Sequence, residues 1–178
     1  MESYQLGVNR VLEVTKDDKP FGVVIKDINT SAEALFPNVR WSFFLSCMDD
    51  IDKEVAKLQE GKEEFRFRQH YGGGWYASVT SGIRCVDLRR FFMNKEGEIK
   101  PTRHGIGLRL PEWEKFKDVL KEMATKEPSM VDTLSCFHQD LSEWVKCKEC
   151  FPFPFYADAC PTPPAPVNPP CLSSSTTS

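Results

Sequence analysis

The chain has 178 residues, of which 40% are hydrophobic and 28% charged, and its formal net charge is −3. This composition is ordinary for a soluble globular protein that is long enough to bury a core. No apolar run approaches the roughly 20 residues of a membrane-spanning helix, and the N-terminus lacks the basic-then-apolar layout of a signal peptide, so we expect an intracellular protein that does not enter a membrane.

The first part of the chain predicts strands followed by a helix. Residues 9–16 and 21–28 predict two strands joined by a polar turn, and the alternation of Trp41, Phe43 and Leu45 predicts a third strand over 39–47. Residues 48–59 have the spacing of an amphipathic helix. We therefore expect a sheet-and-helix unit over residues 1–61, which is acidic because it carries 7 Lys and Arg against 11 Asp and Glu.

The next part of the chain predicts four strands and one helix. The expected strands cover residues 64–71, 72–80, 83–93 and 99–110, with glycine turns between several of them. Pro111 suits the first turn of a helix, because the amide hydrogen that it lacks would have no partner there. Apolar residues then follow from Trp113 at helical spacing. This second unit spans residues 62–126.

The two units share an order of elements, which predicts a degenerate tandem repeat. The alignment that we favour places Leu45 on Leu110 and Met48 on Trp113, and Phe36-Pro37 corresponds to Lys100-Pro101 of the second unit. Together they predict an α+β fold in which each repeat is a curved antiparallel four-stranded sheet with a C-terminal helix.

The last part of the chain divides in two. Residues 127–150 hold an amphipathic stretch that predicts a short accessory helix, and residues 151–178 form a Pro- and Ser-rich tail. The seven cysteines are an odd number, mostly in this region, which favours reduced thiols or a metal over disulfides. Cys147 and Cys150, with Cys160 and His138, could hold zinc, but a single cysteine pair is a weak signal, and we expect no metal or other cofactor.

Charge is distributed unevenly along the chain. Residues 65–110 carry 9 basic against 3 acidic residues, whereas residues 1–61 and 127–178 are both acidic. A basic, strand-rich segment in an acidic protein is a candidate anion site, although solvated surface lysines alone give similar differences. The chain has no Gly-rich phosphate loop, nucleophile elbow or paired catalytic carboxylates, so we do not expect an enzyme.

One stretch resembles a known family. The motifs are Asp87-Leu88-Arg89, Phe91-Phe92-Met93, Glu96-Gly97-Glu98, Lys100-Pro101, Gly105-Ile106 and Pro111-Glu112-Trp113. In this order and spacing they resemble the single-stranded-DNA-binding domain of the transcriptional coactivators called positive cofactor four, or p15. The close resemblance covers about residues 75–123. It implies a curved sheet backed by a helix, in which two copies pair through their helices. Here the two repeats would make that pair within one chain, as an intramolecular pseudo-dimer.

The resemblance also implies which residues bind DNA. Arg89 falls on a phosphate-contacting arginine of the family, Phe92 on a base-stacking tryptophan, and Lys100 and Arg103 on basic positions, while His104 replaces a lysine. From the residues themselves we add Trp75 as a stacking face and Arg68 as a phosphate contact. The family's basic, aromatic hairpin is reduced here to residues 80–83, and Asp17, Asp18 and Asp27 crowd the first unit.

These observations predict a non-catalytic protein that binds single-stranded DNA, with transcription machinery as a further partner, no membrane partner, a nuclear location, and room for homo-oligomers beyond the internal pair. The alternative is a protein-interaction scaffold of the same fold that has lost its nucleic-acid surface. Several residues have alternative roles: Phe92 as a core residue, Arg89 and Arg90 as solvated charges, and Arg66 and Arg68 as protection of an edge strand.

Overall fold

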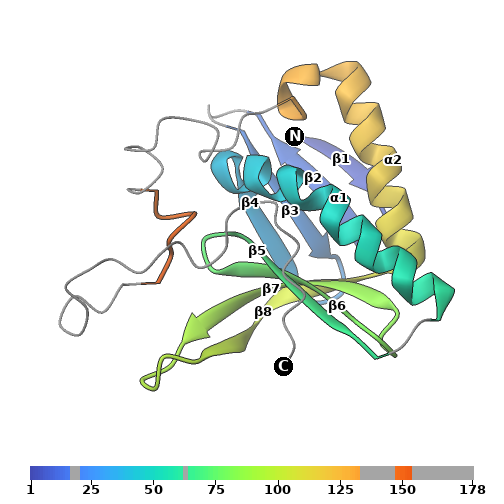
Figure 1. The fold of residues 1–178 in the computed structure, drawn as a ribbon. Helices are drawn as coiled ribbons and strands as arrows, with labels where there is room; N and C mark the ends of the chain where they lie inside the picture. Colours follow the sequence, from blue (N-terminus) through green and yellow to red (C-terminus); the bar gives the residue numbers. More distant parts are fainter. Residues whose placement is uncertain (17–20, 62–63, 133–146, 154–178) are drawn as a thin grey trace.

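A computed structural model describes residues 1–16, 21–61, 64–132 and 147–153, and contains two four-stranded antiparallel sheets and two long helices (Figure 1). In chain order the elements are β1 (Glu2–Gln5), β2 (Arg10–Thr15), β3 (Gly22–Asp27), β4 (Glu33–Pro37), α1 (Asn38–Glu60), β5 (Arg66–Gly72), β6 (Trp75–Thr80), β7 (Cys85–Met93), β8 (Ile99–Arg109), α2 (Leu110–Lys126) and the short 3-10 helix η1 (Pro128–Met130). Consecutive strands pair in each sheet, in the orders β1-β2-β3-β4 and β5-β6-β7-β8. The predicted α+β class is confirmed.

The second sheet and its helix agree with the sequence prediction. Val86 and Leu88 alternate toward the core and are both 0% exposed, as the period of a half-buried strand requires. Gly97 turns the chain between β7 and β8 with a φ of 80°. At the start of α2, the Glu112 carboxylate accepts the Arg109 backbone N–H at 2.8 Å, which satisfies a donor at the helix end.

The predicted strand over residues 39–47 is wrong, because these residues form the first half of α1. Trp41, Phe44, Cys47 and Ile51 are all 0% exposed and follow one another at helical spacing. Phe43 is also buried, because it contacts His70 of the second sheet. This additional buried residue produces the alternation that resembles a strand. The fourth strand of the first sheet is instead β4, and its first strand β1 lies close to the N-terminus.

The two halves correspond in a register that differs from the expected one. Trp41 is the fourth residue of α1, as Trp113 is of α2, and Phe44 and Phe116 are both the seventh. Pro37 ends β4 directly before α1, as Arg109 ends β8 directly before α2. The alignments of Met48 with Trp113, and of Phe36-Pro37 with Lys100-Pro101, are therefore wrong.

Each helix contacts the sheet of the other half. In α1, the Phe43 ring lies 5.4 Å from the imidazole of His70, which belongs to β5. In α2, the Lys126 ammonium lies 5.2 Å from the ring of Tyr4 in β1. The helices also contact each other, since the Trp113 indole N–H donates to Asp52 of α1 at 3.2 Å. The halves thus pair as two subunits of a dimer would, as predicted.

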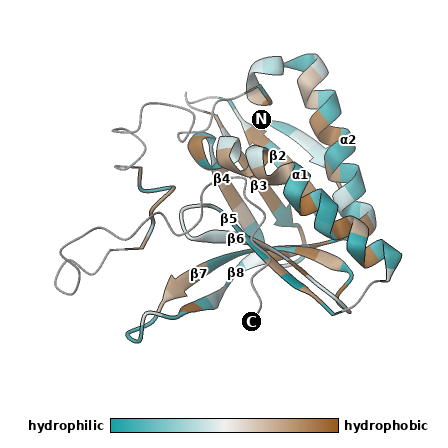
Figure 2. Ribbon diagram, in the orientation of Figure 1, coloured by the Kyte–Doolittle hydropathy of each residue, from teal (hydrophilic) through white to brown (hydrophobic). Residues whose placement is uncertain are grey.

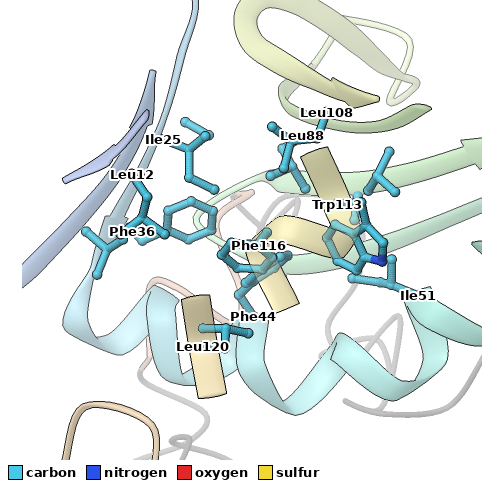
Figure 3. Close-up of a cluster of buried hydrophobic side chains, with 14 of the residues drawn as sticks. Leu12, Ile25, Phe36, Phe44, Ile51, Leu88, Leu108, Trp113, Phe116 and Leu120 are labelled. Carbon is cyan, nitrogen blue, oxygen red and sulfur yellow. The ribbon is translucent and has the colours of Figure 1, made fainter. Parts of the chain in front are cut away.

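Among the described residues, one hydrophobic core joins the two halves. Figure 3 shows Leu12, Ile25 and Phe36 of the first sheet, Leu88 and Leu108 of the second, and Phe44, Ile51, Trp113, Phe116 and Leu120 of the helices gathered in one cluster. Each helix carries both hydrophobic and hydrophilic residues (Figure 2), as expected when one side faces a core. Among the described helices, none is long and apolar enough to cross a membrane.

Most of the predicted accessory helix over 127–150 and nearly all of the tail lie outside the described residues. The same holds for His138 and Cys160. In the part of the chain that the structure describes, no group of three His, Cys, Asp or Glu residues has a metal-binding arrangement. Cys147 and Cys150 are described, but their two candidate partners for zinc are not, so the zinc expectation stays untested.

Gly105 provides a first prediction. A Cβ atom at Gly105 would lie 2.6 Å from the Leu88 carbonyl oxygen and 2.8 Å from Arg89 Cα, both of which are backbone atoms. We expect Gly105→Ala to lower the free energy of unfolding by about 1–3 kcal/mol. Gly107→Ala is the matched control, because its Cβ would meet nothing closer than Cys85 Sγ at 3.7 Å. Equal denaturation midpoints for the two variants would contradict this prediction.

Candidate nucleic-acid interface

The second sheet has a face that points away from the core. Tyr76 of β6 and Arg89 of β7 are paired residues on this face. The Phe91 ring lies 4.9 Å from the Tyr76 ring. The guanidinium of Arg68 lies over both rings, at 5.5 Å from Tyr76 and 5.1 Å from Phe91. Arg68 thus combines a fixed cation with an aromatic support, an arrangement that can receive a phosphate.

Arg89 lies on the same face but already has partners. Its guanidinium forms two bonds with the Asp87 carboxylate, at 3.0 and 3.1 Å, and donates to the Thr102 carbonyl at 3.0 Å. The Arg89 side chain is 26% exposed and that of Asp87 is 29% exposed. A phosphate approaching Arg89 would therefore have to compete with a neighbouring carboxylate.

The outer part of the β7–β8 hairpin, residues 90–103, projects beyond the helices (Figure 1), and we call it the arm. Phe92 is 47% exposed and pairs across the arm with Lys100, so the two side chains lie on one face. The Lys100 side chain is 51% exposed, and its ammonium lies 3.2 Å from the Glu98 carboxylate. Arg103 is exposed on the same arm. An exposed aromatic ring beside a cation is the combination that a base and its phosphate require.

The pairing ladder is irregular at the base of the arm. The pairing register of β7 and β8 shifts between Arg89 and Phe91, and the Thr102 hydroxyl donates to the Arg90 carbonyl at 2.7 Å. Phe91 is 7% exposed and Phe92 is 47% exposed, so only one ring of this pair remains accessible. Neighbouring strand residues point to opposite faces, so Phe92 lies on the face opposite to Phe91 and Tyr76.

Trp75 does not join this surface. It is 5% exposed and belongs to the core, because β6 directs it to the helix side, 6.5 Å from the ring of Tyr71. The expectation that Trp75 offers a stacking face to a base is not supported by this placement. Of the six predicted residues, the structure brings Phe92, Lys100 and Arg103 together on the arm, and Arg68 and Arg89 on the outer sheet face.

The negative charge of Asp27, in the first half, is balanced by a neighbouring arginine. Asp27 is 9% exposed, forms an ion pair with Arg10 and accepts the Asn29 backbone N–H at 2.8 Å. The Asn29 hydrogen bond, followed by the charge of Arg10, lowers the pKa of this carboxyl. Asp27 is therefore a structural residue of the first sheet. Asp17 and Asp18 lie outside the described residues.

His70 lies beside Tyr76, with the two ring centres 5.1 Å apart, and gives a pH prediction. Its imidazole is 7% exposed, and its Nε2 accepts the Gly74 backbone N–H at 3.2 Å. Burial, and then the charge of Arg40, lower the pKa of His70 from 6.5 to about 4. Between these values the unfolded chain binds a proton that the folded chain does not, so His70 makes the fold less stable as the pH falls from 6.5 to 4.

We expect His70 to lower the free energy of unfolding by up to about 3 kcal/mol as the pH falls from 6.5 to about 4. Denaturant unfolding at neutral and acidic pH measures the loss. In His70→Asn, where an amide can still accept the Gly74 N–H, the loss should be smaller by this amount. His104→Asn, at an exposed position, should behave as the unmodified chain does. If all three proteins show the same pH dependence, the prediction is wrong.

Sequence reasoning missed Arg40, because it placed this residue in a strand. The structure places it in the first turn of α1, against Glu149 and beside the turn formed by Gly72, Gly73 and Gly74. The run of three glycines was the available signal, since such a run often marks a close approach of backbone to another group.

Comparison with known proteins agrees with the motif. The family model described as Transcriptional Coactivator p15 (PC4) matches residues 81–119, which run from the β6–β7 turn through the arm into α2. This range contains Arg89, Phe92, Lys100 and Arg103, whereas Arg68 and Trp75 precede it. No solved structure gives a significant match to the chain. At the level of the family, PC4 proteins are transcription coactivators that bind single-stranded DNA. The resemblance predicted from the motifs is thus confirmed, and residues 81–119 of this chain form a PC4-like segment.

Proposed function

We propose that this protein binds single-stranded DNA without catalysis and acts as a nuclear transcription cofactor. The observation that carries the proposal is the exposed Phe92 ring beside Lys100 on the arm, within the segment that matches the PC4 model. A ring that is 47% exposed at the edge of a folded sheet has no role in the core, and it can stack with an unpaired base.

Two features favour single strands over a duplex. Bases that are paired and stacked in a duplex do not offer a free face to Phe92, whereas an unpaired base does. The cations Lys100 and Arg103 lie on the same arm as Phe92 and would follow a flexible backbone, whereas Arg68 lies with Phe91 on the opposite face. Aromatic stacking tolerates any base, so we expect little sequence preference.

The test is a fluorescence-anisotropy titration of the intact chain with an unstructured labelled oligo-dT and with a duplex of equal length at low salt. We expect the single strand to bind more tightly. A duplex that binds as well as the single strand would indicate nonspecific attraction to phosphates, and would contradict the proposal.

One observation favours the alternative, a protein-interaction scaffold. Arg89, which the resemblance assigns to phosphate, is bonded to Asp87 in the same strand. If this pair persists, the outer face presents less positive charge than the sequence indicates. The scaffold then becomes the better description if the chain binds neither oligonucleotide.

A further inference from the structure

The described C-terminal segment, residues 147–153, lies on the turn between β5 and β6. The Gly73 backbone N–H donates to the Glu149 carbonyl at 2.8 Å. The Glu149 carboxylate forms two bonds with the guanidinium of Arg40, from Nε to Oε2 at 3.0 Å and from Nη2 to Oε1 at 3.2 Å. Residues 109 positions apart are thereby joined. The segment is held in place because the Glu149 carboxylate accepts hydrogen bonds from two N–H groups of the Arg40 guanidinium.

Arg40 is positioned by contacts that do not involve Glu149. Its Nη1 donates to the Leu35 carbonyl at 2.8 Å, and its guanidinium lies 5.7 Å from the centre of the Trp75 ring. The Arg40 side chain is only 12% exposed. These contacts would hold the guanidinium in place if Glu149 left, so that a partly buried cation would remain with two unused donors.

The three glycines shape the space around this cation. Gly72, Gly73 and Gly74 have φ values of 120°, 60° and 81°, a region in which side chains are strained. A Cβ atom at Gly73 would collide with Arg40 Nη2 and lie 2.8 Å from Glu149 Oε2. The absence of side chains in the turn is therefore what allows an anion to reach Arg40.

This place adjoins the base of the arm. The Gly74 carbonyl accepts the Phe91 backbone N–H at 2.8 Å, and Trp75 pairs with Arg90 across the sheet. The Phe153 ring lies 3.5 Å from where a Cβ of Gly74 would stand. Residues 147–153 thus lie next to the strand end that carries Phe92.

We propose that Arg40 and the Gly72–Gly74 turn form a second binding site for a phosphodiester of single-stranded nucleic acid, and that Glu149 occupies this site within the free protein. A phosphate presents oxygens to the guanidinium fork much as a carboxylate does. The bound strand and the C-terminal segment would therefore compete for Arg40. The nucleic-acid part of this inference rests on the proposed function, whereas the anion site itself does not.

The test removes the Glu149 carboxylate, which occupies the proposed site. In the full chain, Glu149→Ala should tighten binding of an unstructured oligo-dT about threefold to tenfold, the value of one modest charged contact. It should also steepen the slope of log K against log salt by about 0.7, as expected for one more phosphate contact on a single strand. Fluorescence anisotropy across a salt series measures both quantities.

Two controls separate the site from a general change of charge. Glu114→Ala removes the same charge from an exposed position of α2, where the carboxylate is 51% exposed, and should have less than about half of the effect. Arg40→Lys combined with Glu149→Ala keeps the positive charge but loses the fork, and should return the affinity close to that of the unmodified chain. Equal effects of Glu149→Ala and Glu114→Ala would overturn the proposal.

Inorganic pyrophosphate tests the anion site apart from DNA. It should raise the melting temperature of Glu149→Ala but not that of the double variant, because only the former has an unoccupied fork. If this holds while no variant binds oligo-dT, the anion site stands and the proposed DNA-binding function fails. If pyrophosphate stabilises neither variant and oligo-dT affinity does not rise, the anion site is wrong.

Discussion

Replacing Phe44 by alanine is expected to lower the free energy of unfolding by about 3–5 kcal/mol, the usual effect of removing a buried phenyl ring. Phe44 is 0% exposed. Its ring lies 5.0 Å from that of Phe36 in the first sheet, 4.9 Å from that of Tyr71 in the second, and 5.9 Å from that of Phe116 in α2. One side chain thus contacts both sheets and the other helix, and denaturant unfolding measures its contribution.

Because the core is shared, both halves should unfold in one transition, in the unmodified chain and in Phe44→Ala alike. Val39→Ala is the matched control on the same helix, because Val39 is 40% exposed and its truncation should change stability by about 0.5 kcal/mol or less. Two separate transitions, or a loss for Phe44→Ala no larger than for Val39→Ala, would contradict the description of the halves as one folding unit.

Replacing Phe92 by alanine is expected to have the opposite pattern, with a large effect on binding and little on stability. Loss of one stacked base should weaken oligo-dT binding by about 1–3 kcal/mol, which corresponds to about fivefold to 150-fold in Kd. The melting temperature should hardly change, because the ring is 47% exposed. Anisotropy and thermal unfolding on the same preparation give both values.

Neighbouring Phe91 offers the matched comparison. It is 7% exposed and packs 4.9 Å from Tyr76, so Phe91→Ala should destabilise the fold by about 3–5 kcal/mol. Phe92→Trp, which enlarges the stacking face, should bind at least as tightly as the unmodified chain. A Phe92→Ala variant that loses stability and keeps its affinity would show that this ring is structural.

The second half of the fold could be predicted from sequence because each of its elements is half buried. In β7, Val86 and Leu88 face the core while Asp87 and Arg89 do not, and such alternation is a local property of the chain. The family resemblance rested on the same segment. The start of α2 could also be predicted from local sequence, since Pro111 and Glu112 favour the first turn of a helix.

The first half could be predicted less well because burial there depends on distant residues. The start of α1 is buried by its own sheet, by β5 and by α2, so Phe43 and Phe44 are both covered. Their periodicity then indicates neither a strand nor a one-sided helix clearly. β4, with only five residues, is too short for its alternation to stand out.

Part of the candidate site could likewise be predicted from local sequence, and part could not. Phe92 and Lys100 were predicted from a local motif, and their pairing across the arm follows from the hairpin that contains them. Burial of Trp75 depends on which face of β6 meets the core, and the contact between Arg40 and Glu149 joins residues that are far apart in sequence. Neither is encoded in a local pattern.

The salt dependence of oligo-dT binding by the intact chain tests the central claim most directly. Measured by anisotropy between about 50 and 200 mM salt, log K should fall linearly with log salt, with a slope of about −2 or steeper, which corresponds to about three or more phosphate contacts. Such a slope would fit contacts from Lys100, Arg103 and Arg68. No measurable binding at the lowest salt, or an affinity that does not change with salt, would contradict the claim.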